Sequence, residues 1–115
     1  MLTSKEIAHL AVKALDDKLA RDIQILKTDK VTVLADYFIL CTAGNSTHGK
    51  TLADEVDKVL SQAGEQPLRR EGYRSGGWTL LDFGCVVVHI FSEEMRSFYS
   101  LDRLWSDAEK IDYKD

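Results

Sequence analysis

The pattern of hydrophobic positions predicts two adjoining strands in the last third of the chain, residues 78–83 and residues 86–91. Both runs are rich in β-branched and aromatic residues, and the short Gly84-containing link between them is typical of a β-hairpin. The second run is apolar on both faces except at His89. We therefore expect the second strand to lie well inside the sheet.

Helical periodicity predicts two amphipathic helices in the first half. Thr3 and Glu6 have the spacing of a capping box, and apolar residues then recur on one face to about Lys18. A second helix is predicted after the break at residues 43–46, with Gly64 as its C-terminal cap. Residues 93–97 and 100–110 also favour helix.

The remaining segments complete an α/β pattern. Residues 23–26 and 37–42 are predicted strands, residues 28–30 form a turn, and residues 31–33 are either strand or irregular chain. Pro67 begins a short edge strand that ends at Glu71, and a mobile loop over residues 72–77 leads to the hairpin. This order predicts a single α/β domain over residues 1–115 with a mixed sheet.

Composition narrows the class of protein. A chain of 115 residues can bury a core without disulfide or metal staples. The net charge of −4 disfavours direct nucleic-acid binding and suits a basic protein partner. The first ten residues lack the apolar run of a signal peptide, and no stretch is long enough to span a bilayer. Cys41 and Cys85 form no C-x-x-C pair, so we expect reduced thiols in a cytoplasmic protein.

Residues 44–51 (GNSTHGKT) match the phosphate-loop pattern G-x-x-x-x-G-K-[ST] between a predicted strand and a predicted helix. In such a loop Lys50 would contact the terminal phosphates and Thr51 would hold magnesium. The chain is short for a nucleotide hydrolase, however, and its hairpin is antiparallel where such folds use parallel strands. We favour a helix start rich in capping residues, and keep a small nucleotide-binding or phosphoryl-transfer protein as the alternative.

Other chemistry has weaker support. A small mixed sheet with a Gly-Asn-Ser turn is similar to nucleotidyl-transfer architecture, but Asp82 is the lone carboxylate on its strand where paired carboxylates are needed. The spacing of Cys41, Cys85, His48 and His89 does not indicate a zinc site. A G-x-S-x-G elbow is also absent from the sequence. We therefore expect no catalytic residue, metal or cofactor.

A surface signal remains on the hairpin. Strand alternation places Trp78, Leu80 and Asp82 on one face, which is open if helices cover only the other. Arg96 and Tyr99 follow nearby, and Trp, Tyr and Arg dominate protein interfaces. The competing interpretation is that the apolar residues after position 97 simply pack a last helix onto the core. We expect that packing for most of them, and keep Trp78, Tyr99 and Arg96 as surface anchors.

Short motifs run in order over nearly the whole chain. They are residues 35–39 (ADYFI), Cys41, Thr42, Ser46, His48, residues 53–54, residues 71–72, Trp78, residues 81–82, Gly84, residues 86–89 (VVVH), Arg96, Tyr99, Leu101 and residues 104–105. On these motifs the chain resembles the bacterial ribosomal silencing factors, the iojap-related family. It departs from the family pattern at Cys85, where Asp is common, and at Gly49, which replaces an apolar residue. The phosphate-loop match depends on Gly49 and thus looks accidental.

The resemblance implies a non-enzymatic translation repressor. Such a protein binds ribosomal protein fourteen of the large subunit, sterically blocks joining of the small subunit, and often forms homodimers when free. It also implies a mixed five-stranded sheet flanked by helices, a nucleotidyltransferase-like topology without the catalytic carboxylates. As a hypothesis, we place the partner contact on seven residues: Trp78, Leu80, Asp82, His89, Arg96, Tyr99 and Leu101.

Overall fold

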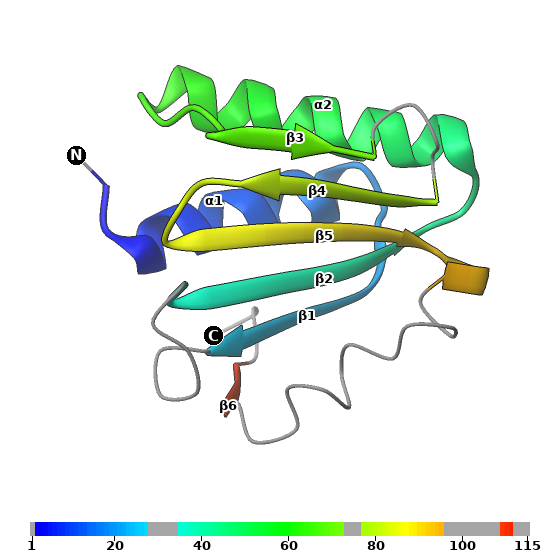
Figure 1. Cartoon of the computed structure of the whole chain (residues 1–115), viewed down its shortest axis with the longest axis horizontal. Coiled ribbons are helices and arrows are strands. Elements are labelled where there is room, and N and C mark those ends of the chain that lie inside the picture. The colour runs from blue at the N-terminus through cyan, green and yellow to red at the C-terminus, as the bar shows by residue number, and fades with distance from the viewer. Residues whose placement is uncertain (1, 28–34, 73–76, 96–108, 112–115) are drawn as a thin grey trace.

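A computed structural model describes residues 2–27, 35–72, 77–95 and 109–111. In chain order the elements are α1 (Ser4–Asp17), β1 (Arg21–Lys27), β2 (Tyr37–Ala43), α2 (Ser46–Gln62), β3 (Arg69–Glu71), β4 (Trp78–Asp82), β5 (Val86–Ser92) and β6 (Glu109–Ile111). The strands form one sheet in the order β3-β4-β5-β2-β1-β6 (Figure 1). Both predicted helices of the first half and the predicted hairpin are confirmed.

The sheet is mixed because its two central strands run parallel. β2 pairs with β5 in parallel from Tyr37↔Val86 to Ala43↔Ser92, and the other neighbouring strands pair antiparallel. β5 therefore lies between β4 and β2, inside the sheet as its apolar sequence predicted. The predicted fold class, a mixed sheet flanked by helices, is confirmed, and β6 adds a short sixth strand beside β1.

The helix predicted for residues 100–110 is wrong at its end. Glu109 and Lys110 belong to β6, where Lys110 pairs with Leu26 and Glu109 pairs with Lys27 of β1. Helix propensity is a weak preference, whereas an unpaired edge such as that of β1 offers a row of backbone hydrogen bonds. Residues 100–108 lie outside the described part of the chain.

Local sequence signals set the ends of both helices. In α1, Glu6 donates its backbone N–H to Thr3 Oγ1 at 3.1 Å, and Thr3 donates its own to Glu6 Oε1 at 3.0 Å, which is the predicted capping box. At the end of α2 the C-cap is Ala63, and Gly64 follows at φ 94°. Gly64 donates to the Ser61 carbonyl and Glu65 to the Leu60 carbonyl, the Schellman pattern that favours glycine at this position.

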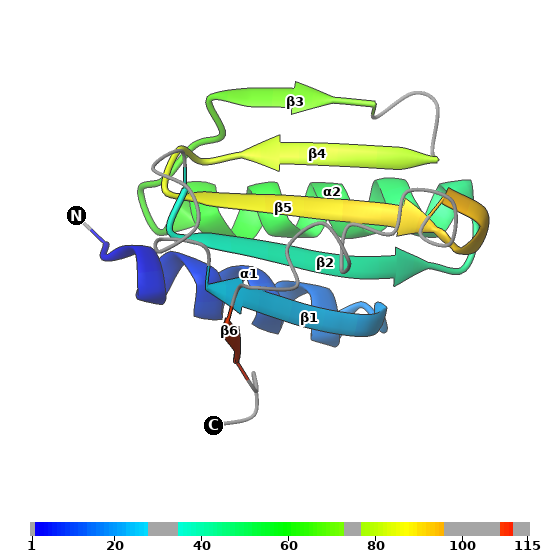
Figure 2. The same cartoon turned by 60° about the horizontal axis from the view of Figure 1, so that its bottom comes forward.

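Both helices cover the same face of the sheet (Figure 2). The main core lies between them and the strands, and Leu15, Ile39, Leu60 and Val88 are among its fully buried members. We call the opposite side the far face, and it carries these residues: Gln24, Leu26, Phe38, Leu40, Trp78, Leu80, Asp82, Val87, His89 and Phe91. The alternation along the strands thus separates a helix-covered core from a second surface.

Several predicted segments fall partly or wholly outside the described residues. These are the turn at 28–30, the segment 31–33, positions 73–76 of the loop before the hairpin, and most of the region after β5. Residues 93–95 are helical, as predicted for the start of that region. The edge strand predicted from Pro67 is confirmed as β3, which begins at Arg69.

Candidate functional site

The two strands of the hairpin bring four of the predicted site residues together on the far face. Trp78, Leu80 and Asp82 are half-buried, whereas the intervening Thr79 and Leu81 are buried toward the helices. His89 of β5 pairs directly with Leu80. The sequence analysis required helices on one face of the sheet only, and α1 and α2 meet this condition (Figure 2). Trp78 packs on the opposite side, with Leu26, Leu40 and Phe91.

Trp78 and His89 form the centre of this surface. Trp78 Nε1 donates a hydrogen bond to His89 Nδ1 at 3.1 Å. The His89 ring also lies 5.1 Å from the Phe38 ring and 6.0 Å from the Phe91 ring, between centroids. The Trp78 ring in turn lies 5.1 Å from that of Phe91. These contacts fix the position of the indole ring on the far face.

His89 is an unusual member of this cluster because it is polar and only 5% exposed. Burial lowers its pKa to about 4 from the ordinary 6.5, and the nearby Asp82 carboxylate offsets this only in part. The imidazole is therefore neutral near pH 7. Its Nε2 atom is buried and has no hydrogen-bond partner among the described residues.

The far face is hollowed on both sides of Leu80. One hollow, of about 320 Å³, has apolar walls that include Phe38, Leu80 and Val87, and His89 also lines it. The other, of about 190 Å³, is lined by Trp78, Leu80 and Glu71. Leu80 lines both hollows and therefore forms a ridge between them. A surface of complementary shape can pack against such a ridge.

Charged and apolar side chains from β3 and the segment before it border the larger hollow. Arg69 pairs with Asp82 across the β3–β4 ladder, with Nη2 3.2 Å from Oδ2. Asp82 Oδ1 also accepts the backbone N–H of Gly84 at 2.8 Å, so the carboxylate is fixed at the hairpin turn. Leu68 lies beside this pair with 73% of its surface exposed.

The structure therefore unites Trp78, Leu80, Asp82 and His89, while Arg96, Tyr99 and Leu101 lie outside the described residues. Sequence reasoning did not assign these further residues of the larger hollow to the surface: Ala35, Phe38, Leu68, Arg69, Gly84 and Val87. Strand alternation would have placed Phe38 and Val87 on the correct face. The contribution of β3 depends on its register with β4, which the sequence does not specify.

The phosphate-loop match does not form an anion cradle. Gly44 donates its N–H to His48 Nδ1 at 2.8 Å, and His48 donates its own to Asn45 Oδ1 at 2.8 Å. The Gly49 N–H already bonds the Asn45 carbonyl at 3.0 Å. Three amides of the loop, those of Gly44, His48 and Gly49, are thus engaged within the helix start, so the geometry favours the capping interpretation of residues 44–51.

No metal-binding group of three or more His, Cys, Asp or Glu side chains occurs in the described part of the chain. Cys41 is buried in the helix-covered core, and Cys85 is a free cysteine at the hairpin turn. Burial raises the pKa of the Cys85 thiol, which disfavours the reactive thiolate. The zinc site considered for these cysteines with His48 and His89 is therefore not assembled among the described residues.

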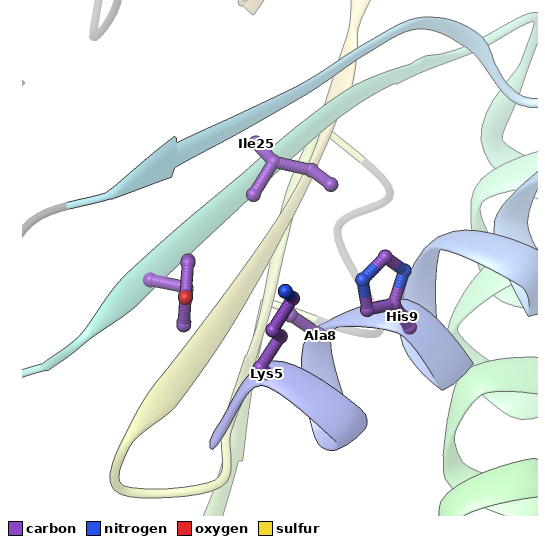
Figure 3. A pocket seen from close by; sticks show the side chains of 5 residues that line it. Lys5, Ala8, His9 and Ile25 are labelled. Carbon is purple, nitrogen blue, oxygen red and sulfur yellow. The ribbon is translucent and has the colours of Figure 1, made fainter. Parts of the chain in front are cut away.

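A third, much smaller cavity lies between α1 and the sheet. Lys5, Ala8 and His9 of α1 face Ile25 of β1 across it (Figure 3), and Tyr37 completes the lining. Its volume of about 20 Å³ suits a single water at most. Within the described residues, neither helix is both long enough and apolar enough to cross a membrane.

The chain is similar to known proteins over most of its length. A family model described as "Ribosomal silencing factor during starvation" matches residues 1–115. The ribosomal silencing factor of Chromobacterium violaceum is 39% identical over 101 residues, which cover 88% of this chain and 83% of that protein. That of Bacillus subtilis is 36% identical over 111 residues, covering 96% and 94%.

The fold is shared as well as the sequence. A crystal structure of a Chromobacterium violaceum protein matches with a TM-score of 0.89 at 37% identity, covering 91% of this chain and 88% of that one. One from Bacillus halodurans matches with a TM-score of 0.84 at 33% identity, covering 94% and 98%. Because the family model spans the sequence and relatives above 30% identity match most of it, the chain belongs to the family of ribosomal silencing factors during starvation.

Proposed function

We propose that this chain, acting as one domain over residues 1–115, is a non-enzymatic translation repressor of the cytoplasm. It binds the large ribosomal subunit through ribosomal protein fourteen and occupies space that the small subunit needs. Self-association of the free protein as a homodimer is part of the same proposal. Membership of the silencing-factor family supports a ribosomal partner. The choice of ribosomal protein fourteen rests on the resemblance of the short motifs to that family.

The observation that carries the proposal is the anatomy of the far face. Trp78 and Leu80 supply an apolar centre, and the Arg69–Asp82 pair supplies a charged border. Protein interfaces combine an aromatic or aliphatic centre with a polar rim in this way. The overall charge of −4 favours encounter with a basic ribosomal protein.

Steric blocking needs no chemistry at this surface. A bound protein prevents subunit joining for as long as it stays bound, so inhibition depends on affinity and concentration rather than on turnover. The mechanism requires no nucleotide, and the Gly44 and His48 amides of the phosphate-loop match are already bonded within the helix start.

Co-sedimentation with isolated large subunits tests the proposal, with and without an excess of small subunits. We expect saturable binding to the large subunit and reduced formation of joined ribosomes. Leu80→Asp should weaken both effects, because it puts a carboxylate on the ridge of the far face. Lys58→Ala is the matched control, since Lys58 is exposed on α2. Absence of saturable binding by the wild type would refute the proposal, as would binding that leaves subunit joining unchanged.

A further inference from the structure

The smaller hollow of the far face combines a carboxylate, an indole and an aliphatic side chain. Its volume is about 190 Å³, and Glu71, Trp78 and Leu80 line it. Glu71 pairs directly with Leu80 across the β3–β4 ladder, so both side chains leave the sheet on the same side. Trp78 stands two residues before Leu80 and shares that side. The register of β3 therefore brings an acidic group into the same depression as the aromatic ring.

The charges that border the two hollows leave an excess of negative charge. Asp82 and Glu71 are acidic, and Arg69 lies between them on β3 and β4. Arg69 contacts Asp82 Oδ2 through both Nε and Nη2, at 3.3 and 3.2 Å, whereas its contact with Glu71 is a single one of 3.5 Å. Among the described residues this is the one ion pair of the exposed Glu71. Its carboxylate is therefore available to a second cation.

The neighbouring Arg70 does not neutralise this carboxylate. Arg70 pairs with Leu81, which is buried toward the helices, so its side chain lies on the opposite side of β3. There its guanidinium contacts α2, at 2.6 Å from Asp57 Oδ2 and 3.2 Å from Asp54 Oδ1. These bonds fasten β3 to α2, and they hold Glu71 at the border of the hollow.

We propose that the smaller hollow receives one cationic side chain of the ribosomal partner protein, a lysine or an arginine, held between the Glu71 carboxylate and the Trp78 ring. The inference rests on the proposed function, which supplies the partner, and adds Glu71 as a binding residue. Long basic side chains pack their aliphatic stems on apolar surface such as that of Leu80. Their charged ends are attracted both to an indole face and to a carboxylate.

Other kinds of side chain fit this hollow less well. The Trp78 Nε1–H is already bonded to His89 Nδ1, so the indole offers a ring rather than a hydrogen-bond donor. An acidic side chain would meet the like charge of Glu71. A purely apolar side chain would take water away from the carboxylate without replacing it by a partner, which is costly. A basic side chain compensates the charge that it covers.

The surroundings of the hollow favour a protein as the source of the cation. The larger hollow lies directly across the Leu80 ridge, and Leu68 is exposed at its border. An isolated cation occupies one depression and leaves this apolar surface uncovered, whereas a protein surface covers both hollows together with the ridge. The net charge of −4 also suits a basic partner.

The first test varies the charge at position 71 in binding isotherms on purified large subunits. Glu71→Gln keeps the size of the side chain and should weaken binding about fivefold, and Glu71→Lys should weaken it at least about twentyfold. Asp17→Asn is the matched control, because it removes one negative charge from an exposed position at the end of α1. Equal affinities of Glu71→Gln and Asp17→Asn would overturn the proposal. A loss in Glu71→Lys no greater than that in Glu71→Gln would also overturn it, since reversal of the charge must cost more than its removal.

The second test distinguishes a cationic occupant from an apolar one. Glu71→Met has a similar length and no charge, so it should lose about as much affinity as Glu71→Gln. Affinity equal to or tighter than that of the wild type would assign an apolar side chain to the hollow and overturn the proposal. Isotherms at rising potassium chloride should show the wild type and Glu71→Gln converging, because salt screens the ion pair that only the wild type makes.

The wild type separates this inference from the function on which it rests. If the wild type does not bind large subunits, the proposed function itself fails. If it binds and blocks joining while Glu71→Lys does the same with equal affinity, only the cation subsite is wrong. Sedimentation velocity is measured in parallel on the free proteins. A change in Glu71→Lys that is confined to self-association would assign the hollow to a second copy and overturn the ribosomal occupant.

Discussion

Trp78 and His89 are diagonal neighbours across the β4–β5 pair, joined by a hydrogen bond of 3.1 Å between Nε1 and Nδ1. One bond thus orients the largest side chain of the far face and assigns the tautomer of the buried imidazole. The position of the indole ring and the unpaired Nε2 of His89 therefore depend on each other within the described part of the chain.

Two substitutions of Trp78 should separate the effect of losing the aromatic ring from the effect of losing its hydrogen bond to His89. Trp78→Ala removes both and should weaken binding to the large subunit by about 2 kcal/mol if the indole is a buried anchor. Trp78→Phe keeps a ring against Phe91 but leaves His89 Nδ1 unpaired, which should lower the free energy of unfolding by about 1 kcal/mol. Urea unfolding and co-sedimentation measure the two effects. Unchanged affinity in folded Trp78→Ala would remove Trp78 from the contact.

Stability should fall in mild acid because of His89. Its pKa is about 4 in the folded protein and 6.5 in an ordinary setting, so between these values the unfolded chain binds a proton that the folded chain does not. The free energy of unfolding therefore decreases as the pH falls through this window. Between about pH 7 and about pH 5 the His89 contribution is roughly 2 kcal/mol.

His89→Gln provides the comparison for this pH effect, because glutamine does not titrate. Urea unfolding of both proteins at each pH should show the wild type losing more stability in acid than the variant. Parallel curves for the two proteins would mean that another group causes the acid sensitivity.

The close approach of Gly72 to the backbone of Trp78 gives a third prediction. A Cβ on Gly72 would lie 1.9 Å from the Trp78 carbonyl oxygen, and Gly72 also has φ 76°. Gly64 has a similar φ of 94°, but a Cβ there meets no atom within 4 Å. Gly64→Ala should therefore cost only backbone strain, about 1 kcal/mol, whereas Gly72→Ala should cost at least about 3 kcal/mol because the start of β4 must move.

Thermal and urea unfolding of these two alanine variants test the difference directly. Gly72→Ala should also weaken binding to the large subunit, since the displaced backbone belongs to Trp78. Equal stability losses in the two variants would show that strain at positive φ, rather than the close approach, dominates at Gly72.

The sequence predicted the parts of this surface that depend on local pattern. Alternation placed Trp78, Leu80 and Asp82 on one face, and a polar residue inside an apolar strand singled out His89. The pairing register of the strands, which brings these residues together, could not be predicted from local sequence. The parallel pairing of β2 with β5 joins Leu40 to His89, residues that are distant in the chain, and such pairing is decided by packing rather than by local preference.

Two further features were beyond sequence reasoning for different reasons. Arg69 reaches the far face through the β3–β4 ladder, in a strand of three residues with little sequence pattern, and Leu68 directly precedes that strand. β6 was missed because its residues favour helix and its stability comes from the edge of β1. In both places a tertiary contact outweighs a weak local preference.

The helix start at residues 44–51 supports a last prediction, which separates capping from nucleotide binding. Asn45→Ala should lower the free energy of unfolding by about 1 kcal/mol, because its Oδ1 caps the His48 N–H at 2.8 Å. Asn45→Ser should recover most of that loss, since serine caps equally well. Lys50→Ala, at an exposed position, should change neither stability nor ribosome binding. Thermal melts with and without magnesium nucleotide complete the experiment. A rise in the melting temperature with nucleotide that is absent in Lys50→Ala would support the phosphate-loop interpretation. In such a loop the Lys50 ammonium group contacts the terminal phosphates.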